Sequence, residues 1–171
     1  MSHLPKVEAF FVTCSKGLLL CRTWGVLRDL PIPEQQSVIE SIIEAAEGSA
    51  RPQHCVRISD FVASTLTFQN ITFYAVGKSN ENTVFLRRVI LTVTEALQNN
   101  PEFATEDVPF QSNIPLLQRI VDDAIYEGTF LDSECNDLIE TSSLNAFYSE
   151  YNISDLGFKG AFKVFKRAVK G

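Results

Sequence analysis

Two apolar, β-prone segments open the sequence, and only three turn-forming residues separate them. Residues 7–14 read VEAFFVTC, residues 18–24 read LLLCRTW, and Ser15-Lys16-Gly17 lies between them. Two such segments joined by a short glycine-containing connection predict a β-hairpin. Because nearly every residue of both segments is apolar, we expect both faces of both strands to be covered, as in the middle of a sheet.

The elements that follow the hairpin define the fold class. Apolar residues recur at helical spacing over about 33–47, and Gly48 closes this predicted amphipathic helix. Strands are predicted over 54–60, 64–69 and 71–77, which together with the hairpin would form a five-stranded antiparallel meander. Helices are predicted over 82–98, from 113 onward, over 133–149 and over 154–170. Strands that cluster in this way predict an α+β fold with an antiparallel sheet flanked by helices.

Composition and charge exclude several classes of protein. No apolar run approaches the roughly 18 residues of a membrane span, and the N-terminus lacks the pattern of a signal peptide, so we expect a cytosolic chain. Residues 156–171 carry five basic residues and no acid. Subtracting these from the net charge of −6 leaves −11 for residues 1–155. An acidic body with a basic tail argues against nucleic-acid binding by the body.

The residues that most often carry catalysis or metals are few and scattered. Four cysteines, Cys14, Cys21, Cys55 and Cys135, form no C-x-x-C pair, so a disulfide framework or a zinc site is not expected, and the first three lie in apolar runs. The only histidines are His3 and His54, which leaves little for hydrolytic catalysis. We therefore predict no enzyme activity, no cofactor and no metal.

The stretch LLQRIVDDAIYEGTFLDSE, residues 116–134, raises the question of what its acids do. They are Asp122, Asp123, Glu127, Asp132 and Glu134. Asp123 and Glu127 are four residues apart and would share a face of one helix. Metal binding or acid–base chemistry would need more ligands or a nearby histidine. Solvation of one helix face is the favoured interpretation, ahead of contact with a partner.

Residues 76–83, VGKSNENT, superficially resemble a phosphate-binding loop. The full pattern requires glycine five residues before Gly77, and Thr72 stands there instead. We interpret the segment as a turn that connects a strand to the following helix.

The end of the chain, LGFKGAFKVFKRAVKG, combines an aromatic stripe with a basic one. Phe158, Phe162 and Phe165 fall at helical spacing, and the neighbouring bases are Lys159, Lys163, Lys166, Arg167 and Lys170. One interpretation is a terminal helix that docks its aromatic face on the rest of the fold while the lysines extend into solvent. The other is a basic amphipathic helix that binds an anionic membrane or an acidic partner.

The order of elements resembles a known family. The opening VEAFFVTCSKGLLLCRTW, a helix, and three strands that end in ITFYAVGKSNENT before a long helix resemble the longin-like, or profilin-like, domain of vesicle-coat subunits, namely the clathrin-adaptor small and medium subunits and the coatomer zeta subunit. The acidic helix of 116–134 is similar to a helix of the same domain. The resemblance covers about residues 6–150, so we assign 1–150 to the domain and 151–171 to a basic tail.

The resemblance implies a non-enzymatic scaffold in membrane trafficking. Such a subunit is held by large helical-solenoid subunits, which a small GTPase recruits, and it is peripheral on Golgi, endosome or ER membranes. The segment FFVTCSKGLLL also resembles the longin domain of the signal recognition particle receptor alpha subunit, which binds its partner GTPase. The alternative function is therefore a GTPase-binding longin domain of a receptor or SNARE-type protein.

Overall fold

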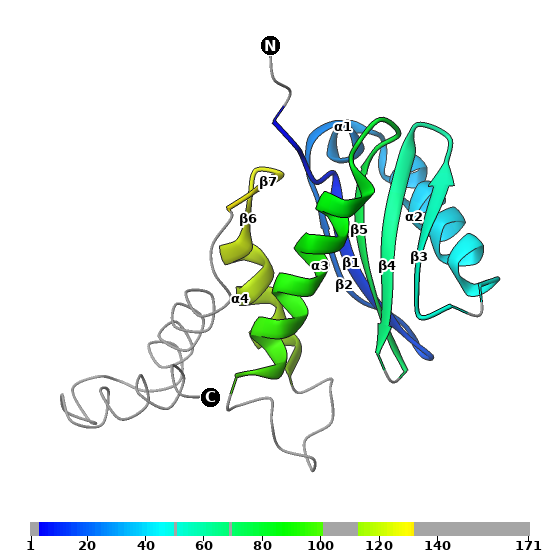
Figure 1. Ribbon diagram of the computed structural model, residues 1–171. Coiled ribbons are helices and arrows are strands. Elements are labelled where there is room, and N and C mark those ends of the chain that lie inside the picture. The colour runs from blue at the N-terminus through cyan, green and yellow to red at the C-terminus, as the bar shows by residue number, and fades with distance from the viewer. Residues whose placement is uncertain (1–3, 50, 69, 101–112, 132–171) are drawn as a thin grey trace, which may run out of the picture. The chain divides into compact units, whose positions relative to one another are not determined.

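The structure is a computed structural model that describes residues 4–49, 51–68, 70–100 and 113–131 (Figure 1). The chain divides into two compact units. The first comprises Met1–Leu91 and Ile125–Phe130, and the second comprises Thr92–Ala124 and Leu131–Gly171. The predicted helices over 133–149 and 154–170, together with the basic tail, lie outside the described residues.

The predicted elements before residue 100 are present, with boundaries shifted by at most a few residues. The five strands of the main sheet are β1 Ala9–Cys14, β2 Gly17–Thr23, β3 Gln53–Ile58, β4 Phe61–Phe68 and β5 Ile71–Lys78. Helix α2 spans Ile32–Glu47, and α3 spans Thr83–Gln98. Pro33 lies in the first turn of α2, where its missing N–H is no loss. The α+β class with a five-stranded antiparallel sheet is confirmed.

The order of the strands corrects two expectations. The sheet runs β2-β1-β5-β4-β3, and all neighbours are antiparallel, so the strands do not form a simple meander. Strand β5 pairs with β1, which sends β2 and β3 to the two edges. The expectation that both hairpin strands lie in the middle of the sheet is therefore correct for β1 and wrong for β2. Most residues of β2 are half-buried or exposed, and a bulge opposite Val12 and Thr13 interrupts its register.

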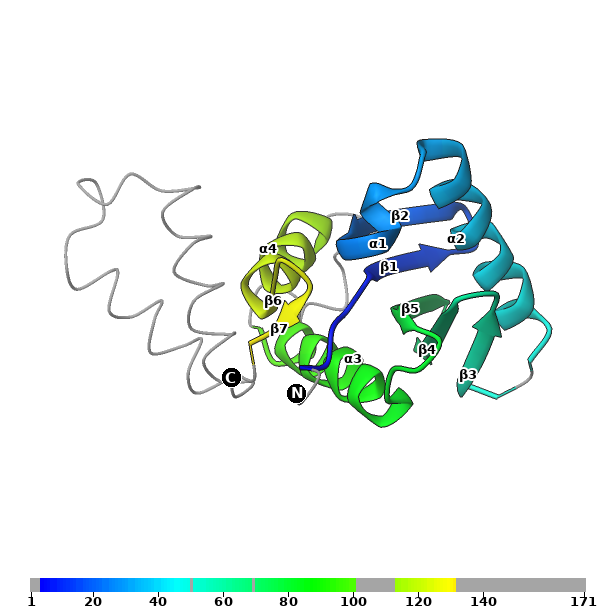
Figure 2. The same ribbon diagram turned by 90° about the horizontal axis from the view of Figure 1, so that it is seen from above.

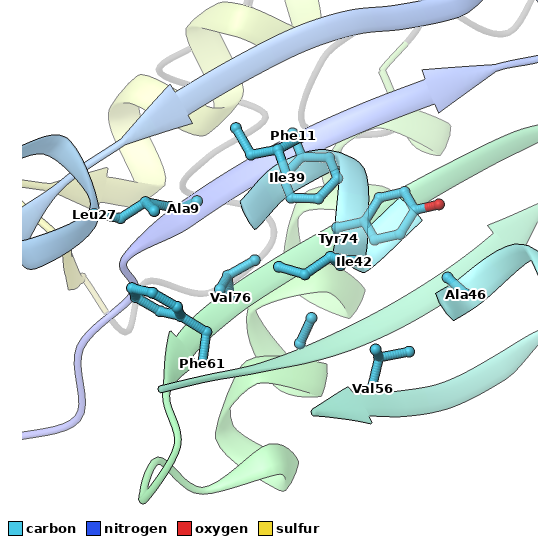
Figure 3. Packing of buried hydrophobic residues seen from close by; sticks show 11 residues of the cluster. Ala9, Phe11, Leu27, Ile39, Ile42, Ala46, Val56, Phe61, Tyr74 and Val76 are labelled. Atoms are coloured by element: carbon cyan, nitrogen blue, oxygen red, sulfur yellow. The ribbon is translucent and has the colours of Figure 1, made fainter. Parts of the chain in front are cut away.

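One face of the sheet packs under α2. Residues from four strands and from α1 and α2 form a continuous buried cluster (Figure 3), which comprises Ala9, Phe11, Leu27, Ile39, Ile42, Ala46, Val56, Phe61, Ala63, Tyr74 and Val76. At its centre the rings of Phe11 and Tyr74 stack, with centroids 4.4 Å apart and planes at 14°. These two residues are register partners on β1 and β5, so strand pairing brings their rings together.

The first half of α3 belongs to the same unit and lies on the opposite face of the sheet from α2 (Figure 2). Side chains along a strand alternate between the two faces of the sheet, so only alternate residues of a strand can contact α3. A Cβ added at Gly77 would lie 3.4 Å from Leu86 Cδ1, and Ser64 Oγ donates a hydrogen bond to the Thr83 carbonyl at 3.5 Å. Leu86, Val89 and Ile90 are buried. The predicted amphipathic stripe of this helix therefore faces inward.

One short helix and one short hairpin were not predicted. Helix α1, Gly25–Asp29, follows β2 directly, and the strands β6, Ile125–Tyr126, and β7, Thr129–Phe130, form a separate hairpin. The turn between β6 and β7 has positive φ at Glu127 (48°) and Gly128 (77°), as in a type I′ turn. Elements this short give almost no periodic signal, so the sequence pattern does not indicate them.

The described residues of the second unit, 92–100, 113–124 and 131, include the end of α3 and helix α4, Ile114–Ala124. The predicted helix from 113 onward is thus confirmed up to Ala124. Its predicted apolar stripe is buried, namely Leu116, Leu117, Ile120, Val121 and Ala124.

Burial of Tyr74 makes stability sensitive to alkaline pH. Burial raises the pKa of its phenol above the ordinary 10.0, and the carboxylate of Glu47 adds to this, whereas hydrogen bonds with Thr13 and Thr72 act in the opposite sense. The unfolded chain therefore loses this proton at a lower pH than the folded chain. The contribution to stability is complete below pH 10 and is lost as pH rises through the folded-state pKa.

We expect the urea midpoint of unfolding to fall when pH rises from 8 to above the ordinary tyrosine value of 10.0. Tyr74→Phe should make this fall smaller. The Cys21 thiol, whose pKa burial also raises, leaves a residual slope that Cys21→Ala should remove. An unchanged alkaline slope in the Tyr74→Phe variant would contradict the assignment.

Candidate interaction surface

Several segments that are distant in sequence meet at one end of the first unit. They are the N-terminal segment 4–8, residues 24–29 with α1, the β5–α3 connection with the first turn of α3 (78–84), and the β6–β7 hairpin (125–130). We call this region the N-terminal pole. Hydrogen bonds and close contacts connect all four segments.

The β6–β7 turn is anchored to the start of the sheet through its glycine. The Val7 N–H donates to the Gly128 carbonyl at 2.8 Å. A Cβ added at Gly128 would lie 2.7 Å from the Val7 carbonyl oxygen and 3.2 Å from Trp24 Cβ. Arg28 Nη1 and Glu127 Oε2 form an exposed ion pair at 3.3 Å. Only glycine provides both the positive φ and the free space that this contact requires.

Glu8 holds α1 against the sheet. Its side chain is 3% exposed, and its Oε2 accepts a hydrogen bond from the Leu27 N–H at 3.2 Å. Trp24 at the N-cap of α1 makes no side-chain cap. The carboxylate of Glu8, which lies outside this helix, instead accepts a hydrogen bond from its first turn. Gly25 has φ +55°, and an added Cβ would lie 2.6 Å from Glu8 Oε2. The main chain of Glu8 also bridges two strands, donating to Val76 and accepting from Trp24.

The connection from β5 to α3 closes a polar hollow at this pole. Glu81 accepts hydrogen bonds from the N–H groups of Lys6 (3.1 Å) and Asn82 (3.0 Å), and Asn82 Oδ1 caps α3 through the Val84 N–H at 2.9 Å. The hollow has a volume of about 250 Å³, and Glu8 and Lys78 line it as well. The segment 76–83 is a strand-to-helix connection, as predicted, and the side chains of Glu81 and Asn82 take part in its hydrogen bonds.

Each segment of the N-terminal pole also carries an exposed apolar side chain. Leu4, Val26, Val84 and Tyr126 are 69, 45, 71 and 68% exposed, and each belongs to one of the segments of the pole. A gathering of exposed apolar residues beside polar groups is typical of protein–protein contact surfaces. The pole is therefore the candidate interaction surface of the first unit.

The acids of 116–134 occupy different positions from those expected. Helix α4 ends at Ala124, and Glu127 lies in the β6–β7 turn, so Asp123 and Glu127 do not share a helix face. Asp122 is exposed and Asp123 is half-buried. Glu127 instead pairs with Arg28. Asp132 and Glu134 lie outside the described residues. No three His, Cys, Asp or Glu side chains gather into a potential metal site in the part of the chain that the structure describes.

His54 and the cysteines lie away from the pole. The Thr65 hydroxyl lies 3.0 Å from His54 Nδ1, its neighbour across β3 and β4. Cys14, Cys21 and Cys55 are free thiols, and Cys55 is exposed, although it lies in an apolar run. The predicted tail site comprises Phe158, Lys159, Phe162, Lys163, Phe165, Lys166, Arg167 and Lys170, and all of it lies outside the described residues.

Sequence reasoning missed the residues that build the pole. One signal was present, because Glu8 is the only charged residue in the apolar run VEAFF. A charge in a buried strand requires a hydrogen-bonding partner. The partners Gly25 and Leu27 could not be identified, since they lie beyond the following strand.

The fold is that of a longin-like α+β protein. No protein-family model matches the sequence, and no curated protein matches it in sequence. In structure the chain is similar to a chain of "Homology model of the full-length AP-3 complex in a stretched open conformation", with a TM-score of 0.63 and 13% sequence identity. The match covers 88% of this chain and 99% of that chain. Within the described ranges, every helix is too short or too polar to cross a bilayer.

Proposed function

We propose that the chain is a non-enzymatic subunit of a vesicle coat or adaptor complex in intracellular membrane trafficking, where it works by binding other proteins. The observation that carries this proposal is the structural match to one chain of the AP-3 model, which covers 88% of this chain and 99% of that chain. A match confined to part of the sheet would support no more than a common structural motif.

The partners that we propose are large helical-solenoid subunits, with contact to trafficking membranes made peripherally through the complex. The exposed apolar residues of the N-terminal pole support this proposal, because they offer a surface that association would remove from water. An interface of this kind should bury more than the roughly 1,600 Å² of a standard complex.

A capture experiment with matched variants tests the function. We expect the wild-type chain, expressed at native level, to co-purify with large solenoid subunits, and Tyr126→Asp to reduce their recovery by about tenfold or more, as loss of an interface aromatic does. Leu18→Asp is the control, because Leu18 is a similarly exposed apolar residue at the start of β2, away from the pole.

Recovery of a single small GTPase in its GTP form, in place of large subunits, would instead support the alternative of a GTPase-binding longin domain. Equal losses of recovered large subunits for Tyr126→Asp and Leu18→Asp would show that the N-terminal pole is not the binding surface. The proposed class of partner would still stand.

The basic tail is proposed to add a contact with an anionic membrane. Each lysine near an anionic surface contributes about 1 kcal/mol at moderate ionic strength. Replacing Lys159, Lys163, Lys166 and Lys170 together by glutamine should lower co-sedimentation with phosphatidylserine vesicles by at least about tenfold. Neutral phosphatidylcholine vesicles are the control. Binding that is the same on both vesicle types, or unchanged in the variant, would instead favour docking of the tail on protein.

A further inference from the structure

The β6–β7 hairpin is a short insertion into the first unit from a part of the chain that otherwise belongs to the second. Residues on both sides of it, up to Ala124 and from Leu131, are assigned to the second unit, whereas Ile125–Phe130 is assigned to the first. Each of its strands has two residues, compared with six to eight in the main sheet. Its attachment to the first unit is therefore a separable feature of the fold.

Among the described residues, the hairpin is attached by the burial of Ile125, which is 2% exposed, and by three modest polar or aromatic contacts. One is the backbone hydrogen bond from Val7 to Gly128. The second is the Arg28–Glu127 ion pair, whose side chains are 52% and 63% exposed, so that solvent screens it. The third is an edge-to-face contact between the rings of Phe85 and Phe130, with centroids 6.1 Å apart.

The strands of the main sheet are held much more firmly. Strand β1 lies between β2 and β5 and pairs with both along its length. Its buried residues Phe10, Phe11 and Val12 have no exposed surface. Removing the hairpin leaves this ladder and the cluster beneath α2 unchanged. An isolated two-stranded hairpin is marginal in water, so the detached segment would not keep its own structure.

We propose that the β6–β7 hairpin is a detachable clasp: it leaves the N-terminal pole while the five-stranded sheet stays folded. Opening frees the Val7 N–H, uncovers the side of Trp24 that Gly128 covers, and moves Glu127 away from Arg28. The pole thus has two states with different exposed groups, and anything that binds one state better shifts the population toward it. The clasp is independent of the proposed coat function.

Amide hydrogen exchange on the full chain tests the clasp. In the wild type, the Val7 amide should exchange about 10- to 1,000-fold faster than the amides of Phe11 and Tyr74, because local opening is easier than global unfolding. Arg28→Ala should accelerate Val7 exchange about two- to fivefold and leave Phe11 unchanged, as expected for loss of an exposed ion pair. Glu127→Gln should have a similar effect.

The double variant and a control make the result specific. Arg28→Ala combined with Glu127→Gln should accelerate Val7 exchange no more than either change alone, because both remove the same ion pair. Arg57→Ala, at an exposed arginine on β3, should change nothing at Val7. The clasp is overturned if Val7 and Phe11 exchange at the same rate, or if Arg28→Ala accelerates both equally, since the hairpin would then open only when the sheet unfolds.

Discussion

Replacement of Phe11 by alanine is expected to lower the free energy of unfolding by about 3–5 kcal/mol, the range for a buried aromatic residue cut back to a methyl group. Phe11 has no exposed surface, and its ring stacks on Tyr74 in the middle of the cluster beneath α2. The change removes the transfer free energy of the ring and leaves a cavity between β1, β5 and α2. Such a cavity closes poorly, because the paired strands hold its walls apart.

Urea titration followed by circular dichroism measures this loss. Phe68→Ala is the matched control, since Phe68 is 45% exposed on β4 and its removal should lower the free energy of unfolding by no more than about 1 kcal/mol. If Phe11→Ala were no more destabilising than Phe68→Ala, Phe11 would not belong to the tightly packed cluster shown in Figure 3.

Replacement of Gly25 by alanine should lower the free energy of unfolding by about 2–5 kcal/mol. A positive φ of 55° disfavours any residue with a Cβ, by about 1–2 kcal/mol. The new Cβ would also lie 2.6 Å from Glu8 Oε2, so the carboxylate must move away from the Leu27 N–H. A buried hydrogen bond lost in this way adds about 1–3 kcal/mol.

Two further variants separate these causes. Gly48→Ala, at the end of α2, should be close to neutral, because Gly48 has a helical backbone conformation (φ −69°) and the nearest atom to an added Cβ is 3.7 Å away. Glu8→Ala destabilises on its own by loss of the same hydrogen bond. Combined with Gly25→Ala, it should give less than the sum of the single effects, because the clash is then absent. Strict additivity would show that Gly25 and Glu8 do not interact.

Detachment of the clasp would limit how much a change in the β6–β7 turn can lower the free energy of unfolding of the whole chain. Gly128→Ala would strain the turn and press a methyl group against the Val7 carbonyl. If the clasp detaches, the loss in free energy cannot exceed the stability of its attachment. Gly25 has no such release, because Leu27 of α1 belongs to the buried cluster and the main chain of Glu8 is hydrogen-bonded to Val76 of β5. This difference explains why the larger effect is expected at Gly25.

Periodic pattern was sufficient to place every element with six or more residues in the described part of the chain. The apolar run of β1, the helical stripes of α2 and α3, and the turn at Gly17 each have a local physical cause that acts within a few residues. The same reasoning interpreted the loop 76–83 correctly as a connection. The prediction that Glu127 lies on a helix was wrong. The helix-forming pattern continues through 114–127, but the turn conformation at Glu127 and Gly128 ends the helix at Ala124.

The amino-acid sequence thus determined the elements and the α+β class, because hydrophobic periodicity and turn residues act locally. The pairing of β1 with β5, the burial of Glu8 beside Gly25, and the docking of the β6–β7 turn on Val7 were decided only by tertiary structure. These contacts join residues separated by 17 to more than 100 positions. Their geometry depends on how the sheet closes between β1 and β5, and no local pattern specifies that pairing.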